Sequence, residues 1–179
     1  NVTVEQLVPF IVERTGKVVM PQADVLSRKL TVLNDQEIPR AQALDLVFLA
    51  LHQSGVAVVE TPTTITLRDI TEVDRQDVPV LGPDESVLDR MDLGSMAEKV
   101  FTLSHSSAEN FGEILKDSIP KYAKLTVDKD SNQIAVMGNI ALLQRMERLI
   151  GSLDRASADS LMTETFRLRY ADAVTIAEN

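Results

Sequence analysis

The chain has 179 residues, of which 44% are hydrophobic and 25% are charged, and it contains no cysteine. This composition is ordinary for a folded protein, and the lack of cysteine excludes a disulfide framework, a thiolate nucleophile and a cysteine zinc site. The formal net charge of −9 opposes binding to nucleic acid, because that binding depends on cationic contacts to phosphate groups. No apolar run approaches the roughly 18–20 residues that a membrane span requires.

Negative charge is concentrated in residues 69–95, which hold 8 acidic and 2 basic residues and so carry −6 of the net charge. Prolines and glycines interrupt this stretch at Pro79, Gly82, Pro83 and Gly94. We therefore predict an extended acidic linker over residues 71–95, between a domain at 1–70 and a second domain at 96–155. A few apolar residues in it can form a short docked segment: Val73, Val78, Val80 and Leu81.

The first domain is predicted to run in the order α-β-β-α-β-β. Its first helix opens with a capping box at Thr3, continues with apolar residues at helical spacing, and ends at Gly16. A second helix starts at Pro39 and ends at Gly55. Four strands complete the domain, and the last two form a hairpin: 17–20, 29–33, 56–60 and 64–68.

The outer strand of this hairpin alternates Thr64, Thr66 and Arg68 with Ile65 and Leu67. A period of two directs the apolar pair to the core and the other three side chains outward. Because an edge strand offers unpaired backbone groups to a partner strand, we predict a partner-contact edge at Thr64, Thr66 and Arg68. A solvated edge protected by Arg68 fits the same pattern.

The second domain is predicted as β-α-β-β-α, an α+β sandwich with both helices on one face of the sheet. A strand at 100–103 precedes a helix that opens with a capping box at Ser106 and stops before Pro120. A hairpin follows, with strands at 125–128 and 133–137, and Asn139 then caps the last helix. This order is KH-like, but the Gly-x-x-Gly loop with which KH domains clamp RNA is absent.

A sequence repeat suggests that the chain is modular. The pattern Phe101-x-Leu103-x-His105-x-x-Ala108-x-x-Phe111 recurs 65 residues later as Phe166-x-Leu168-x-Tyr170-x-x-Ala173-x-x-Ile176. Residues 156–179 are therefore predicted to begin a third domain, a second copy of the repeat that is truncated here.

No pattern in the sequence indicates catalysis. Neither a Gly-x-Ser-x-Gly elbow nor a P-loop is present. Asp128-x-Asp130-x-Asn132 opens like a calcium loop, but glycine is missing at its sixth position and glutamate at its twelfth. The two histidines, His52 and His105, lie far apart, and each is interpreted as structural. We predict no enzyme activity, no cofactor and no metal.

Three segments resemble the repeated periplasmic domain of bacterial secretins of the general secretion pathway protein D type. They read V-F-T-L-S-H-S-S-A from Val100, L-T-V-D-K-D-S-N-Q-I-A-V-M-G from Leu125 and L-I-G-S-L-D from Leu149. Residues 3–68 resemble the secretin N-terminal domain. The positions that match the family pattern are Gly16, Gly55, Leu103, Ala108, Asn132, Gly138, Leu153 and Asp154.

The resemblance implies the periplasmic portion of an outer-membrane channel that exports folded proteins in type II secretion. Such domains stack as homo-oligomeric rings, contact an inner-membrane platform protein and enclose the exported substrates. Alternatives that stay open are a secretin of a type IV pilus or type III system and an uncharacterised hydrolase. A signalling or peptide-binding domain of the type found in TonB-dependent receptors is another, although the 65-residue repeat speaks against it.

Overall fold

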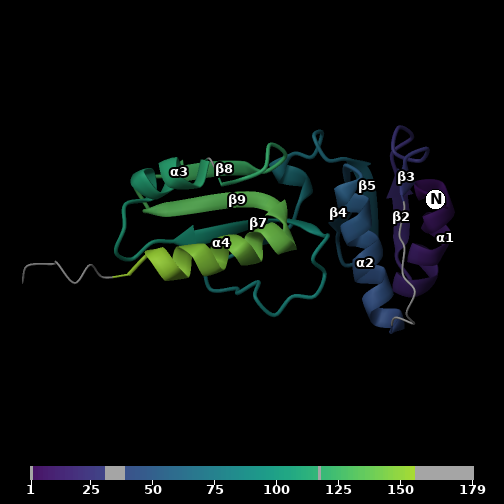
Figure 1. Ribbon diagram of the computed structural model, residues 1–179, viewed down its shortest axis with the longest axis horizontal. Coiled ribbons are helices and arrows are strands. Elements are labelled where there is room, and N and C mark those ends of the chain that lie inside the picture. The colour runs from purple at the N-terminus through teal and green to yellow at the C-terminus, as the bar shows by residue number, and fades with distance from the viewer. Residues whose placement is uncertain (1, 31–38, 117, 156–179) are drawn as a thin grey trace, which may run out of the picture.

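The computed structural model describes residues 2–30, 39–116 and 118–155, which form two α+β domains side by side (Figure 1). The expected α+β class is confirmed. The segment 156–179, predicted to begin a third domain, lies outside the described residues, as does the end of the strand expected at 29–33.

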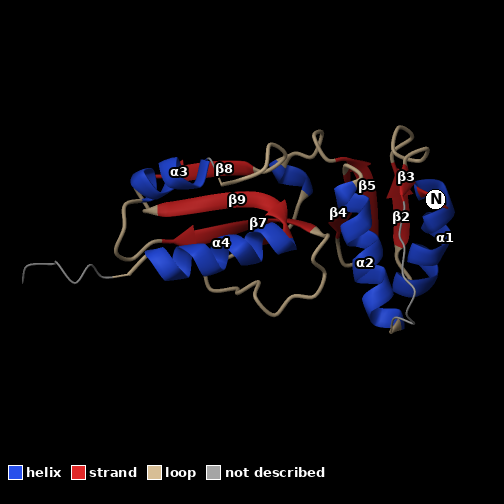
Figure 2. Ribbon diagram, viewed as in Figure 1, coloured by secondary structure: helices blue, strands red, loops and turns tan. Residues whose placement is uncertain are grey.

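The first domain places two helices against two small sheets (Figure 2). The helices are α1 (Val4–Thr15) and α2 (Arg40–Gln53). One sheet pairs β1 (Val2–Thr3) with β3 (Lys29–Leu30) in antiparallel fashion, and β1 had no counterpart among the predicted elements. The other sheet has the order β2 (Val18–Pro21), β5 (Thr64–Asp69) and β4 (Val56–Glu60).

Local capping explains where α1 begins and ends. The Thr3 amide donates to Oε1 of Gln6 at 3.1 Å, as a capping box requires. Gly16 adopts φ +66° and donates its amide to the Val12 carbonyl at 2.8 Å. A left-handed residue at this position suits glycine, which has no Cβ to clash with the backbone.

Strand β4 is buried on both faces, with Val56 to Val59 all at 3% exposure or less. Val56 and Val58 point into the core of the first domain, where they meet Phe48 and Leu51 of α2. Ala57 and Val59 point the other way and belong to a separate apolar cluster shared with the second domain. The near-continuous apolar sequence of β4 therefore reflects two different packing partners.

The second domain has one four-stranded sheet in the order β6 (Val80–Leu81), β7 (Met96–Thr102), β9 (Gln133–Asn139) and β8 (Lys124–Asp128). Its helices are α3 (Ala108–Lys116) and α4 (Ile140–Leu153). The predicted strands and helices are present. However, β7 starts before the expected strand at 100–103, and α3 begins after Ser106, at Ala108. Asn139 caps α4 as expected, because its side-chain oxygen accepts the Leu142 amide at 3.0 Å.

The segment predicted as an extended acidic linker is not extended. It contains the short helix η1 (Arg75–Asp77), and its strand β6 pairs in parallel with β7. Of the apolar residues expected to dock, Val73 and Val78 are buried, whereas Val80 is 61% exposed. Residues 71–95 are called the connector below.

Three polar side chains of the second domain hold the connector in place. Buried Lys99 donates its ammonium to the carbonyls of Gly82 and Pro83. Gln144 of α4 donates to three connector carbonyls, and the Glu147 carboxylate accepts from Ser86 and from the Val87 amide. Backbone groups that a solvated linker would leave to water are thus satisfied by protein, which is the reason the expected linker is ordered.

Candidate interaction surface

The described residues contain no cluster of three or more His, Cys, Asp or Glu side chains that could hold a metal ion. In the same ranges, none of the helices combines the length and hydrophobicity needed to cross a membrane. The described surface offers sheet edges and a groove, and these can receive another protein.

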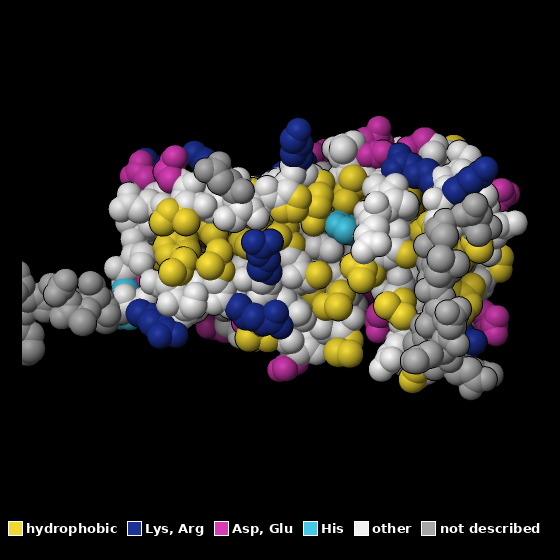
Figure 3. Space-filling model, viewed as in Figure 1, with side chains coloured by type: hydrophobic (Ala, Val, Ile, Leu, Met, Phe, Trp, Pro, Cys, Tyr) yellow, Lys and Arg dark blue, Asp and Glu magenta, His cyan; other side chains and the backbone are white. Residues whose placement is uncertain are grey.

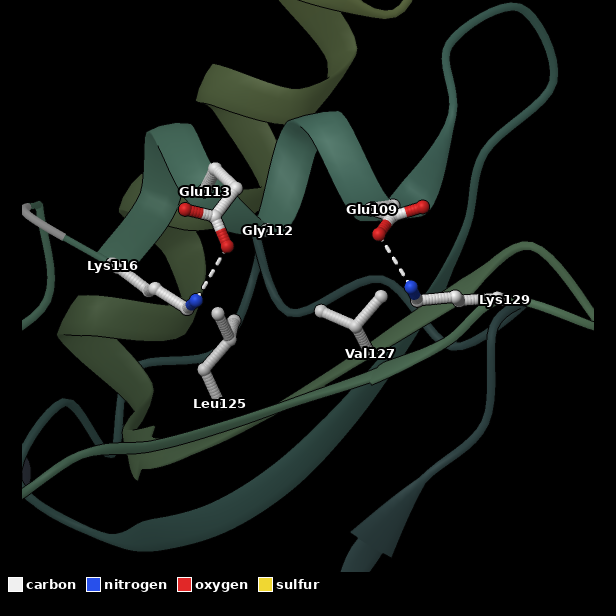
Figure 4. Close-up of a pocket in the computed structure, with 7 residues that line it drawn as sticks. All are labelled: Glu109, Gly112, Glu113, Lys116, Leu125, Val127 and Lys129. Carbon is white, nitrogen blue, oxygen red and sulfur yellow. Dashed lines mark hydrogen bonds and ion pairs between the residues drawn. The ribbon is translucent and has the colours of Figure 1, made fainter.

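A groove of about 290 Å³ lies between α3 and β8 (Figure 4). Leu125 and Val127 of β8 lie opposite Gly112 of α3, and together they form its apolar lining. A Cβ added at Gly112 would lie only 2.4 Å from Cγ2 of Val127. Glycine at this position is therefore what lets α3 approach β8 so closely.

Two ion pairs flank this groove. The Lys129 ammonium contacts the Glu109 carboxylate, and the Lys116 ammonium lies 2.5 Å from Oε1 of Glu113. The hydrogen bond from Lys116 lowers the pKa of Glu113. All four side chains are more than half exposed, so the pairs add little to stability. Their charges can instead select what enters the groove.

The two outer strands of the second sheet lie at opposite ends of the strand order. Strand β8, beside the groove, pairs only with β9, and β6 pairs only with β7 among the described residues. Val80 of β6 is 61% exposed. The domain thus presents two different surfaces at opposite edges, as a head-to-tail contact between identical subunits requires.

The predicted partner-contact edge at Thr64, Thr66 and Arg68 is wrong, because β5 is the central strand of its sheet. Its second neighbour is β2, which pairs with it in parallel from Val18 opposite Thr64. Arg68 is also engaged, with Nη1 2.6 Å from Oδ2 of Asp77 in the connector. A hairpin pattern reveals the antiparallel partner of a strand, but it carries no signal for a parallel partner far away in sequence.

Outward-facing apolar side chains of the first domain lie instead on β1 and β2. Val2 is 40% exposed, Val18 62% and Met20 47%. The amides of Val18 and Gln22 are directed at β5, where they donate to Thr63 and Leu67. The opposite side of β2 has no strand partner in the described ranges, and Pro21 removes one donor from it.

Several matched family positions have clear structural roles. Asn132 adopts φ +51° and donates its side-chain amide to Leu103 and Ser106, while its oxygen accepts from the Ala108 amide. Asp154 accepts from the amides of Ser104, His105 and Ser106. These contacts shape the loop before α3, so the positions specify the fold rather than a reaction.

The remaining matched positions act through packing or backbone geometry. Leu103 and Ala108 are buried in the core of the second domain, whereas Leu153 is 49% exposed. Gly55 adopts φ +81° at the end of α2, and the carbonyl of that residue accepts from Nη1 of Arg28 at 2.7 Å. A Cβ at Gly138 would lie 2.7 Å from Cδ2 of Leu142.

The two histidines occupy different environments. His105 is exposed on the loop before α3. His52 is partly buried near the end of α2, where its ring meets the Tyr122 ring of the second domain at 4.7 Å between centroids. The contact of His52 with another domain could not be predicted, because the stretch that holds Tyr122 has no helical or strand period.

Comparison with known proteins shows that this chain is similar to components of bacterial secretion systems. Residues 98–159 match the family described as Bacterial type II/III secretion system short domain. The chain is 30% identical over 104 residues to the secretin GspD of Escherichia coli (strain K12), which covers 51% of the chain. That alignment spans only 16% of the relative, so the chain corresponds to a small part of a much longer protein.

A solved structure covers nearly the whole chain. It is the Klebsiella pneumoniae type II secretion system outer membrane complex, described as PulD, PulS and PulC HR domain. The match has a TM-score of 0.73 with 18% sequence identity, and it covers 98% of this chain and 29% of the solved one. At this identity the match establishes the fold.

Residues 98–159 are therefore similar to the short domain of bacterial type II/III secretion systems. The resemblance to the N-terminal domains of type II secretins is confirmed, and secretins of this kind are components of protein transport systems.

Proposed function

We propose that this chain is a periplasmic module of an outer-membrane secretin, in which it builds a ring with copies of itself and binds a component of the inner-membrane platform. The module acts by contact and not by catalysis, and the ring surrounds the path of exported proteins in type II secretion. The family match across residues 98–159 carries the proposal, because that segment forms most of the four-stranded sheet.

Ring building is supported by the two unlike edges of this sheet. A contact between the α3–β8 groove of one copy and the β6 edge of the next joins different surfaces, so each subunit leaves one of each surface open. Such heterologous contacts close into a ring when the rotation between subunits allows it.

Cross-linking in the complete channel protein tests this contact. The chain has no cysteine of its own, so Val80→Cys and Glu113→Cys introduce one thiol at each surface. The double variant should give a ladder of multimers when a short bifunctional maleimide is added to membranes, because the contact repeats around the ring. Each single variant is the matched control and should give no ladder. Absence of the ladder from the double variant in assembled channels would refute the contact.

Platform binding is supported by the apolar strand residues of the first domain. The related complex described above includes a PulC HR domain, and exposed apolar side chains near a strand edge suit the docking of a small partner domain. We expect Val18→Asp with Met20→Asp, or Val2→Asp, to weaken binding of the corresponding domain at least tenfold by calorimetry. Val12→Asp on α1, where the valine is 41% exposed, is the control. Equal affinity in all variants would place the contact elsewhere.

A further inference from the structure

The two domains meet at an apolar joint that both domains and the connector build together. Its buried members are Ala57, Val59, Val73, Val78, Met96 and Met137. Backbone contacts reinforce it, since Val58 and Ser95 form a parallel bridge. A Cβ at Gly94 would lie 2.3 Å from the Phe48 carbonyl carbon, so the connector lies directly against α2.

An aromatic pair crosses between the domains beside this cluster. The rings of His52 and Tyr122 meet edge to face, with an interplanar angle of 80° and 4.7 Å between centroids. The Tyr122 hydroxyl donates to Oδ1 of Asn139 at 3.2 Å, and the same oxygen caps α4. The His52 ring thus lies next to a residue that is hydrogen-bonded to the cap of a helix in the other domain.

The environment of the His52 imidazole does not favour a positive charge on the ring. Its Nδ1 atom is buried and has no hydrogen-bond partner among the described residues. A proton added to the ring makes both nitrogens donors and creates a charge that burial disfavours. In keeping with this geometry, burial lowers the pKa of His52.

We infer that the joint is a proton-sensitive hinge, which is closed while the His52 imidazole is neutral and loosens when that imidazole binds a proton. When the domains separate, water can solvate the ring and its pKa returns to about 6.5. The closed joint therefore keeps its full stability above about pH 6.5 and loses it as the pH falls below that value. The ratio of open to closed molecules rises by up to about tenfold per pH unit until the lower pKa of the closed state is passed.

Other charged groups surround the joint but do not hold this imidazole. They are Arg28 before β3, Asp69 of β5, Lys124 of β8 with Asp74 of the connector, Asp45 of α2, Glu60 of β4, and Arg90 and Asp92 of the connector. None of them forms an ion pair or hydrogen bond with His52 in the described ranges. Burial, and then the nearby charges of Asp92 and Glu60, raise the pKa of Asp45, so this carboxyl is tested as a competing titration.

The experiment measures the distance between domains at two pH values. Spin labels are placed on Glu13→Cys in α1 and Ser152→Cys in α4, both at exposed positions, in the 179-residue chain, which offers no other thiol. Electron–electron double resonance should give one narrow distance distribution at pH 7.5. At pH 5.0 the share of a broader, open population should rise several-fold.

Matched variants test whether the change in distance between the two pH values depends on protonation of His52. His52→Gln keeps a neutral polar side chain that cannot titrate, and it should abolish the change between the two pH values. His105→Gln removes the only other histidine, which is exposed, and Asp45→Asn removes the competing carboxyl; both should leave the change intact. A wild-type distribution that is identical at the two pH values, or a full response in His52→Gln, would overturn the hinge.

Nuclear magnetic resonance keeps the inference testable if His52→Gln does not fold. In the unaltered chain, the ring signal of His52 should titrate below 6.5, and the amides of Ala57 and Val59 should shift at the same pH. Titration at or above 6.5, or titration without a response of these amides, would contradict the inference.

Discussion

Two polar side chains organise the loop before α3: Asn132, which lies between β8 and β9, and Asp154, which follows α4. Asn132 closes the hairpin and holds the loop through Leu103, Ser106 and Ala108. The Asp154 carboxylate follows α4 and accepts three consecutive amides. Each side chain satisfies backbone groups that neither helix nor strand can reach, which explains why these residue types mark the family pattern.

Asp154→Ala should lower the free energy of unfolding by about 1–2 kcal/mol, the usual cost of losing a carboxylate cap. Burial opposes ionisation of Asp154, but the amides of Ser104, His105 and Ser106 outweigh it and lower its pKa. The contribution is therefore complete above about pH 4 and fades as the pH falls through the lowered value. Urea unfolding at pH 7 and pH 3 measures it, with Asp130→Ala on the exposed hairpin turn as the control. Equal loss at both pH values would show that the charge is irrelevant.

The connector is an element of the second domain in its own right. It adds β6 to the sheet, and its last residues reach the start of α4, where the Ser95 and Leu93 carbonyls accept from Ile140 and Ala141. Its acidic side chains contribute to the net charge of −9. Its backbone is held by hydrogen bonds to Lys99, Gln144 and Glu147. We propose that the folding unit of the second domain starts before β6 and not at residue 96.

Lys99→Met tests the role of this buried ammonium. Methionine has a similar length and is apolar, so the variant leaves the carbonyls of Gly82 and Pro83 without a donor at a cost of about 1–3 kcal/mol. Limited proteolysis within residues 82–92 should become several-fold faster, with cleavage elsewhere unchanged. Lys129→Met, on the exposed rim of the groove, should leave the cleavage rate as it is. A connector that stays equally resistant in Lys99→Met would show that other contacts suffice.

Local sequence patterns predict most of the helices and strands, but they predict few of the pairings between strands that are distant in sequence. The capping box at Thr3, the glycines at 16 and 55 and the two hairpins were readable because their signals lie within a few residues of one another. The parallel pairs β2–β5 and β6–β7 could not be predicted from the sequence, since a parallel partner leaves no turn signature. The burial of Lys99 and the place of His52 at the domain joint could not be predicted for a related reason, because burial of a polar residue depends on segments that are distant in sequence.

At the scale of the whole molecule, the two domains are held together by the apolar joint. The face shown in the space-filling view carries apolar side chains over both domains, with Lys and Arg side chains among them (Figure 3). The joint is small and built from few side chains, so a single substitution should be able to open it.

Gly94→Ala is expected to open the joint at every pH while each domain stays folded. The added methyl would overlap the Phe48 backbone, which cannot move away as a flexible side chain could. The spin-label distance at pH 7.5 should therefore broaden, whereas far-ultraviolet circular dichroism should not change. Gly151→Ala in α4 is the control, because nothing lies within 4 Å of the added atom and alanine favours helix by about 1 kcal/mol. A narrow distance in Gly94→Ala would show that the contact is not tight.

The double burial of β4 has a consequence for synthesis. When the ribosome has released the first domain but not the second, Val56 and Val58 already have their partners, whereas Ala57 and Val59 still face water. A nascent chain at that stage exposes the apolar side chains of Ala57 and Val59 on a sheet that has already formed. These side chains are covered only when residues 96 and 137 have emerged. Translation of the second domain therefore completes the first, and a pause between the two is the moment at which the protein is most open to aggregation or to a chaperone.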